Sequence, residues 1–190
     1  MFLLHGPTDS AIRRFIDAQA ELSFSYAEVG GSRVTPPHRY TTDHNRIKLG
    51  QGPEVFARAV AALTRWEMFN LEWIQLCWPD TPIEINSSVA VVARHFGFYS
   101  LNACRIVYVI DEDGPIKKFG FGYGTLPDHA ERGEERFTVE WCKSEDTVWY
   151  EILAFSTPNH FLARIAYPIT RMFQKRFAED SKRAMVKAVI

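Results

Sequence analysis

Residues 119–137 read FGFGYGTLPDHAERGEERF, and this segment constrains the fold more than any other part of the chain. Successive side chains of a β-strand point to opposite faces, so the alternation predicts a strand with one filled face and one bare face. The filled face carries Phe119, Phe121, Tyr123 and Thr125, and only glycines lie between them. Three bare positions indicate strong sheet curvature or the close approach of another backbone, helix or ligand. We therefore expect this strand to form a pocket wall.

The segment belongs to a series of apolar and aromatic runs that are typical of strands. The runs are residues 73–78, 88–98, 104–111, 118–126, 136–143 and 147–156. Polar hairpin turns are expected at residues 111–115 and 143–146. Short turns join antiparallel neighbours, whereas parallel strands need longer crossovers. The pattern therefore excludes a doubly wound parallel sheet.

Three helices are predicted around these strands. The first follows a capping cluster at residues 8–10, and the second begins at Gly52 and Pro53 and ends near Asn70. The third is capped by Thr157, starts at Pro158 and is kinked by Pro168. Its apolar side is expected to carry Phe161, Leu162, Ile165, Ile169, Met172, Phe173 and Phe177.

The connection between the first two helices is the least regular part of the chain. Residues 24–29 predict a strand, and residues 30–46 are rich in glycine, proline and polar side chains. Long irregular connections in compact domains are often functional. We therefore expect residues 30–46 to act as a lid.

These elements predict an α+β fold, in which a curved antiparallel sheet wraps around a long C-terminal helix in a helix-grip arrangement. We expect a single domain over residues 1–190, because a chain of this length buries roughly 70% of its unfolded surface without metal or disulfide. Cys77, Cys104 and Cys142 lie far apart in apolar runs, as reduced thiols of a cytoplasmic protein do.

Composition also argues against several classes of function. The formal net charge of -1 provides no general attraction to nucleic acid. No run approaches the roughly 18 apolar residues of a membrane-spanning helix. Metal, nucleotide and hydrolase motifs are absent from the sequence, so we expect neither a metal nor a cofactor.

The sequence of residues 119–137 also resembles the signature of a known family. It matches the signature F-G-F-x-Y-G-T-L-P-x-H-x-E-x-G-E-E-x-F, with a departure at Asp128, where many members have glycine. This signature is typical of an uncharacterised domain-of-unknown-function family of bacterial and plant proteins, and the resemblance covers nearly the whole chain. The family is similar to START-like helix-grip proteins, which include hydrophobic-ligand carriers and polyketide-cyclase-like enzymes. The resemblance implies this fold and class of ligand but no particular activity.

The charged turn of the segment is the leading candidate for chemistry. His129 exchanges protons near neutral pH, and Glu131, Glu134 and Glu135 have the chemistry to orient it or act as general bases. The more ordinary interpretation is a solvated surface turn with structural ion pairs. Glu134 and Glu135 point to opposite faces of a strand, and Glu135 shares the parity of Tyr123. We therefore select His129 and Glu135 as candidate catalytic residues.

Candidate ligand-binding residues lie on the predicted strands. Arg105 interrupts an apolar alternation and has the geometry to bind a ligand carboxylate, although a rim position or an ion pair is the simpler interpretation. Aromatic residues at strand period provide area for a flat or lipid-like ligand, but they are more often core. The remaining ligand-binding candidates are Tyr108, Phe121, Tyr123, Thr125, Trp141 and Phe155.

Three functions follow from these observations. We favour a binding module that holds a small hydrophobic or amphipathic molecule between the sheet and the C-terminal helix. The second is a cyclase- or hydrolase-like enzyme that uses His129 or a glutamate in acid–base catalysis. The third is a protein-interaction module that uses a sheet edge or the basic C-terminal helix. The sequence leaves the oligomeric state open.

Overall fold

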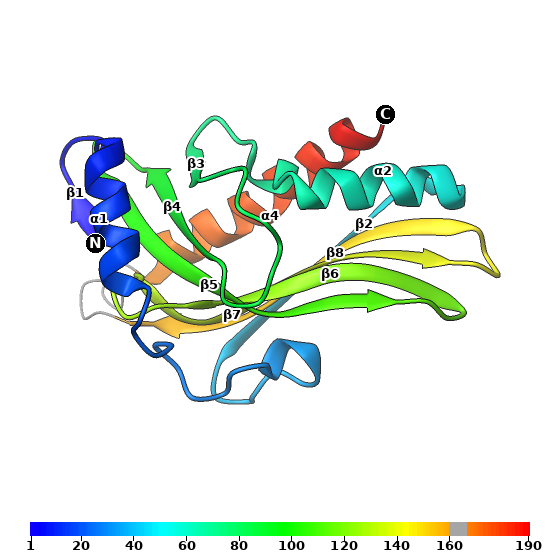
Figure 1. Ribbon diagram of the computed structural model, residues 1–190, viewed down its shortest axis with the longest axis horizontal. Helices are drawn as coiled ribbons and strands as arrows, with labels where there is room; N and C mark the ends of the chain where they lie inside the picture. Colours follow the sequence, from blue (N-terminus) through cyan, green and yellow to red (C-terminus); the bar gives the residue numbers. More distant parts are fainter. Residues whose placement is uncertain (160–166) are drawn as a thin grey trace.

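The computed structural model describes residues 1–159 and 167–190, in which one curved antiparallel sheet carries helices on both faces (Figure 1). The strand order is β2 (Thr41–Gln51), β8 (Thr147–Pro158), β7 (Glu131–Cys142), β6 (Ile116–Thr125), β5 (Tyr99–Glu112), β4 (Ser88–Arg94) and β3 (Ile74–Cys77), and β1 (Phe2–Leu3) pairs with β5. The helices are α1 (Asp9–Gln19), α2 (Gly52–Thr64) and α4 (Tyr167–Val189), with short 3-10 turns η1 (Gly31–Arg33) and η2 (Glu67–Phe69).

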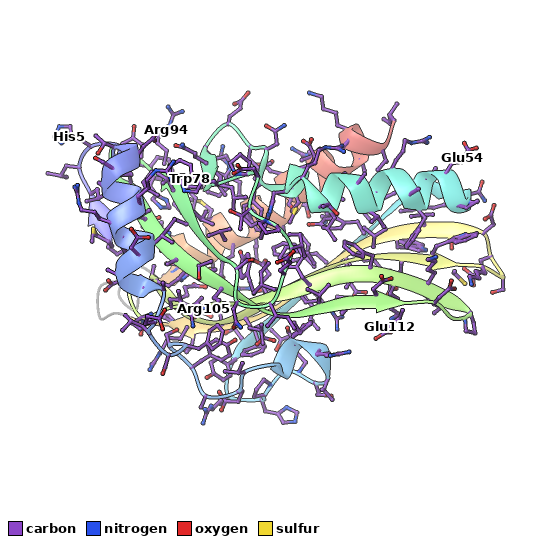
Figure 2. The ribbon with its side chains drawn as sticks, viewed as in Figure 1. His5, Glu54, Trp78, Arg94, Arg105 and Glu112 are labelled. Atoms are coloured by element: carbon purple, nitrogen blue, oxygen red, sulfur yellow. The ribbon has the colours of Figure 1, made fainter. Side chains whose placement is uncertain are left out.

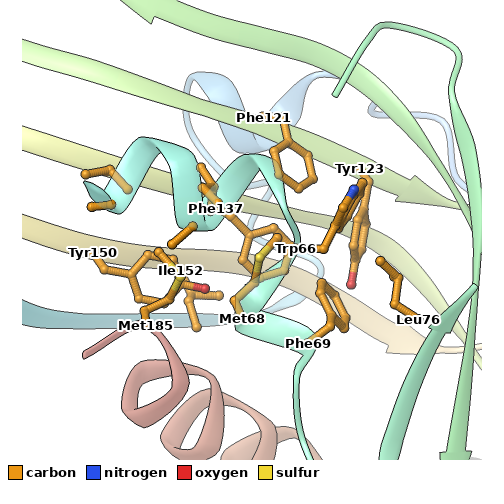
Figure 3. Close-up of a cluster of buried hydrophobic side chains, with 14 of the residues drawn as sticks. Trp66, Met68, Phe69, Leu76, Phe121, Tyr123, Phe137, Tyr150, Ile152 and Met185 are labelled. Carbon is orange, nitrogen blue, oxygen red and sulfur yellow. The ribbon is translucent and has the colours of Figure 1, made fainter. Parts of the chain in front are cut away.

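The inner face of the sheet packs against α2 and α4, which confirms the predicted helix-grip arrangement (Figure 1). The main core lies between this face and the helices, where Trp66 contacts Phe121 with ring centroids 4.8 Å apart. Figure 3 shows this cluster, with Phe137 and Tyr150 on the sheet side and Met185 on the helix side. Burial of such large side chains from water contributes about 2 kcal/mol each.

The outer face carries α1 and an irregular segment. Helix α1 begins after Thr8, whose hydroxyl accepts a hydrogen bond from the Ala11 N–H, and buries Ile12 and Phe15 against β4 and β5. The segment between α1 and β2 crosses the same outer face, on the side opposite α2 and α4 (Figure 1).

The bare glycine face of β6 is on this outer side and not in a pocket. A Cβ added to Gly122 would lie 2.4 Å from the Tyr108 ring, and one added to Gly124 would lie 2.2 Å from the Tyr26 hydroxyl oxygen. The glycines therefore provide room for two tyrosine rings. The predicted close approach is present, but the filled face, with Tyr123 and Thr125, is the one that lines a cavity.

The prediction for residues 24–46 was wrong in two respects. Residues 24–29 contain no strand, whereas Thr41–Gln51 forms β2, an edge strand paired with β8 along its length. The first residues of β2 are polar, so the sequence shows no apolar alternation there. A strand at the edge of a sheet needs apolar side chains on one face only. Residues 30–40 lie on the outer face, so the expected lid over the cavity is not present there.

The predicted ends of two helices also need correction. Helix α2 ends at Thr64 and η2 follows it, and β8 continues to Pro158, so Thr157 and Pro158 belong to a strand. Helix α4 is described from Tyr167, so the predicted kink at Pro168 falls at the boundary of the described residues. The predicted apolar positions Phe161, Leu162 and Ile165 lie outside the described residues.

Candidate functional site

A cavity of about 610 Å³ lies between the inner face of the sheet and α4. Its apolar wall comes from Phe69 and Trp73, which precede β3, and from Phe173 and Phe177 on α4. The Phe69 and Phe177 rings lie 5.2 Å apart, and the Trp73 and Phe173 rings 5.7 Å apart. Phe173 and Phe177 are four residues apart, so they face the cavity from successive turns of the helix.

The polar side of the cavity is built by strand register. Tyr123 on β6 pairs with Glu135 on β7, which pairs with Ala154 on β8, which pairs with Asp43 on β2. Residues opposite each other in neighbouring strands point to the same face, so all four line the cavity. The small Ala154 side chain between two acidic residues leaves the space open.

Glu135 is the most perturbed acid in this row. Its Oε2 accepts a hydrogen bond from the Tyr123 hydroxyl at 2.9 Å. Glu135 lines the cavity, and the burial of its carboxyl among protein atoms, reinforced by Glu131 and Asp43, raises its pKa to about 7 despite the opposing hydrogen bond from Tyr123. At neutral pH the group therefore exchanges between an acid and a carboxylate.

Two more acids lie beside Glu135. Burial raises the pKa of Glu131, whose Oε2 accepts a hydrogen bond from the Gln174 amide while its buried Oε1 has no hydrogen-bond partner among the described residues. Asp43 is different, because Arg171 on α4 binds both of its oxygens, with Nη2 2.6 Å from Oδ1. Arg171 therefore neutralises Asp43, whereas no basic side chain of the described part of the chain pairs with Glu131 or Glu135.

The histidines lie along the same cavity. Nδ1 of His129 accepts a hydrogen bond from the Glu131 N–H at 3.0 Å, so a neutral ring carries its proton on Nε2. His95 contacts Ser100 at 2.8 Å, and burial lowers its pKa, which keeps it neutral at pH 7. These contacts place two imidazole rings beside the acids of the cavity.

The predicted site residues that line the cavity are Tyr123, Thr125, His129, Glu135 and Phe155. Thr125 has a structural role as well, because its Oγ1 accepts a hydrogen bond from the Gly133 N–H at 3.0 Å. The structure thus brings both candidate catalytic residues to one cavity. The hydrogen bonds given above link Glu135 to Tyr123 and His129 to Glu131.

Arg105 and Tyr108 lie on the outer face, which corrects the expectation that they bind the ligand. Arg105 donates to the carbonyl oxygens of Gln19 and Leu22 at 2.9 and 3.1 Å and so holds the end of α1 (Figure 2). Tyr108 hydrogen-bonds Ser32 at 2.5 Å. A shift in register between Ile106 and Tyr108 marks a bulge in β5, so strand parity alone misplaces residues beyond it.

Three other predicted residues have aromatic rings that pack against other aromatic rings, and of the three only Phe155 lines the cavity. Phe121 faces inward but is fully buried against Trp66 (Figure 3), and Trp141 packs against Phe56 at the far end of the sheet. The Phe155 ring points outward to Tyr26 and Tyr40, so the aromatic side chain is part of the outer layer. All three rings pack against other aromatic side chains, as the simpler interpretation of the sequence expects, although Trp141 is only half-buried.

Glu134 has a purely structural environment on the outer face. Its carboxylate accepts hydrogen bonds from the Tyr26 hydroxyl at 2.6 Å, from the N–H groups of Gly30 and Ser32 at 2.7 and 2.9 Å, and from the Ser32 hydroxyl. Burial and the neighbouring Glu134 carboxylate raise the pKa of Tyr26, so the phenol remains a donor. Glu134 therefore fastens residues 26–32 to the sheet.

Replacing Glu134 with glutamine should destabilise the protein by about 2–4 kcal/mol, because the amide nitrogen would face N–H donors and leave buried groups unpaired. Urea unfolding measures this loss, and hydrogen exchange should show faster exchange at Gly30 and Ser32. Glu145→Gln, in the exposed turn between β7 and β8, is the matched control. Equal stability of the two variants would contradict the structural role of Glu134.

Sequence reasoning missed part of the site. Asp43 was assigned to a loop, and Phe69 and Trp73 come from the irregular region around η2, where no period marks an inward side. The place of these three residues in the site depends on tertiary structure and is not visible in the sequence pattern. The helical spacing of Phe173 and Phe177 did identify the α4 wall, although it did not separate core from cavity.

Neither a cluster of metal-binding side chains nor a membrane-spanning helix is found in the part of the chain that the structure describes. Within residues 1–159 and 167–190, no three His, Cys, Asp or Glu side chains are grouped so that they could hold a metal ion. No helix in the same residues has both the length and the apolar character needed to cross a bilayer.

Comparison with solved structures shows the same fold in another chain. A hypothetical protein from Helicobacter pylori superposes with a TM-score of 0.53 at 10% identity, over 88% of this chain and 96% of that chain. Human STARD10 gives a TM-score of 0.49 at 11% identity, over 97% of this chain and 80% of that chain.

Sequence comparisons identify the family. A UPF0548 protein from Dictyostelium discoideum is 39% identical over 208 residues, covering 100% of this chain and 96% of the relative. Another from Deinococcus radiodurans is 34% identical over 200 residues, covering 99% and 98%. The model of the domain of unknown function DUF1990 matches residues 25–184, and the predicted membership of an uncharacterised family is confirmed. This chain therefore belongs to the DUF1990 family.

Proposed function

We propose that this protein binds a small amphipathic molecule in the cavity between the sheet and α4. The observation that carries the proposal is the cavity itself, which has a volume of about 610 Å³, an aromatic wall and a row of polar side chains on the opposite side. Ligand sites are typically concave, mostly apolar and of this size, with a few polar groups that orient the ligand. A ligand with an apolar part against Phe69 and Phe177 and a polar group near Glu135 fits this arrangement.

Native mass spectrometry of the protein purified from its own host tests the proposal. A stoichiometric small molecule that is released by organic extraction is the expected result. N-phenyl-1-naphthylamine, whose fluorescence rises in apolar surroundings, provides a second assay on the unloaded protein. Absence of both a co-purifying molecule and dye binding would contradict the proposal.

Replacing Ala154 with phenylalanine should block the cavity, because the new ring would project between Glu135 and Asp43 into the open space. We expect dye binding to weaken at least about tenfold, since a ring of this size displaces the ligand from its contacts. Leu153→Phe is the matched control, because Leu153 points to the outer face of the same strand. Equal binding by both variants would place the ligand elsewhere.

Catalysis is a second candidate function, and the raised pKa of Glu135, about 7, is the observation that favours it. A carboxyl with a pKa near ambient pH is suited to both general acid and general base roles. Once the ligand is identified, the wild type and Glu135→Gln should both be tested for its chemical conversion. If the protein is an enzyme that uses Glu135, the wild type converts the ligand and the variant does not. If the protein is a carrier, both bind the ligand and leave it unchanged.

A further inference from the structure

On the polar side of the cavity, two acids form no ion pair with any other residue that the structure describes. Glu131 and Glu135 both line the cavity on β7, and within the described residues neither forms an ion pair. The Arg171 guanidinium near this side is bound to both oxygens of Asp43. Buried acids without a counter-charge reduce stability, so they are expected mainly where a ligand or a reaction uses them.

An atom of Glu131 points independently to a missing partner. Its Oε1 is buried and accepts no hydrogen bond from the described residues, although Gln174 donates to Oε2. Nearly all buried side-chain oxygens in proteins are hydrogen-bonded, so an unpaired carboxylate oxygen beside a cavity marks a position for a donor.

The apolar wall is also suited to a cation. Aromatic ring faces attract ammonium groups, and the wall consists of Phe69, Trp73, Phe173 and Phe177. Lys175 also lines the cavity, but it lies on the exposed side of α4 with Glu179 one turn away, so its charge is solvated. Tyr123, His95 and His129 also line the cavity, whereas the side chains of the lining residues His44 and Glu134 point to the outer face, where they bind Glu151 and Tyr26.

We infer that the ligand is an amphipathic amine, whose protonated nitrogen binds between the Glu131 and Glu135 carboxyl groups while its apolar part packs against the aromatic wall. The inference rests on the proposed function and specifies the class of ligand. An ammonium group donates up to three hydrogen bonds, enough for the open oxygen of Glu131 and for Glu135, whose Oε2 is already bound by Tyr123. It also supplies a positive charge to two acids that form no ion pair within the described residues.

Two probes that differ only in charge test the inference. Dansylcadaverine carries a primary ammonium group on a flexible chain, and its N-acetyl derivative keeps the same fluorophore and chain without the charge. At pH 8 we expect the amine to bind at least about tenfold more tightly, which is the effect of one charge-assisted hydrogen bond with a partly desolvated carboxylate. At pH 5.5 this preference should fall, because Glu135 is then mostly protonated.

Variants of Glu131 and Glu135 test whether these two acids cause the preference for the amine probe. Glu135→Gln should reduce the preference for the amine, and the double variant Glu131→Gln/Glu135→Gln should bring the two probes within about twofold of each other while still binding both. Glu145→Gln is the control and should behave as the wild type. Both substitutions remove an unpaired charge, so loss of folding is not expected.

The outcomes separate the inference from the function on which it rests. Equal binding of both probes by the wild type would overturn the amine assignment and leave a ligand cavity intact. A preference that persists in the double variant would show that other groups recognise the amine and would also overturn it. Failure of both probes to bind would contradict the proposed function itself.

Discussion

Gly133→Ala is expected to unfold the protein or to destabilise it by at least about 4 kcal/mol, because the new methyl group has no space and the backbone has the wrong conformation for it. A Cβ at Gly133 would lie 1.9 Å from the carbonyl oxygen of Phe155 and 2.8 Å from Cα of Ser156. Both are backbone atoms of the neighbouring strand, so the clash cannot be relieved by a rotamer change. Gly133 also has a φ of 152°, which favours glycine.

Urea unfolding measures this effect, with Gly114→Ala as the matched control. A Cβ at Gly114 meets nothing closer than 3.8 Å, so that variant should stay within about 1 kcal/mol of the wild type. The comparison tests the site as well as the fold, because Gly133 lies between Glu131 and Glu135 on β7 and sets their approach to β8. A Gly133→Ala variant with the unfolding midpoint of the wild type would contradict the strand pairing described for this region.

Glu135→Gln is expected to stabilise the protein at pH 8 by about 2–3 kcal/mol and to have little effect near pH 5. The pKa of Glu135 is about 7 in the folded state, above the ordinary value of 4.5. A raised carboxyl pKa means that the folded state favours the protonated form, so its contribution to stability is complete below pH 4.5 and is lost as the pH rises through about 7. Glutamine does not titrate, and its side-chain oxygen accepts the Tyr123 hydrogen bond as the protonated acid does.

Urea unfolding of both proteins at pH values from 5 to 8 gives the free energy of unfolding that this prediction concerns. The difference should grow with pH, whereas Glu145→Gln, in an exposed turn, should show none. A difference that is the same at every pH would mean that Glu135 titrates as it does in the unfolded chain. Such a gain on removing an acid is characteristic of groups kept for function at a cost in stability.

Strand alternation predicted which way side chains point, but not what they contact. The glycine and aromatic alternation of residues 119–125 identified a strand, its filled face and the need for close approach, because side-chain direction in a strand depends only on position along the chain. The same parity placed Glu134 and Glu135 on opposite faces. It did not indicate that Glu134 would bind Tyr26 and Ser32, which are about 100 residues away in the sequence.

The positions of polar residues in the fold follow least directly from the sequence. Residues 41–46 are nearly all polar, so hydrophobic periodicity does not reveal that they begin the edge strand that brings Asp43 to the cavity. The bulge in β5 put Tyr108 on the outer face, and no turn residue in the sequence announces it. In both cases the outcome depends on pairing with a strand that is distant in the sequence.

Local pattern alone therefore determined the antiparallel sheet, the long C-terminal helix and the strand faces, because the periods of 2 and 3.6 residues follow from backbone geometry. Tertiary structure decided which of these faces encloses a cavity and which acids in it form an ion pair with another described residue. Arg171 binds Asp43, and not Glu131 or Glu135 among the described residues, because of where α4 crosses the sheet. The pKa of Glu135 depends on that burial, and burial is a property of the assembled fold.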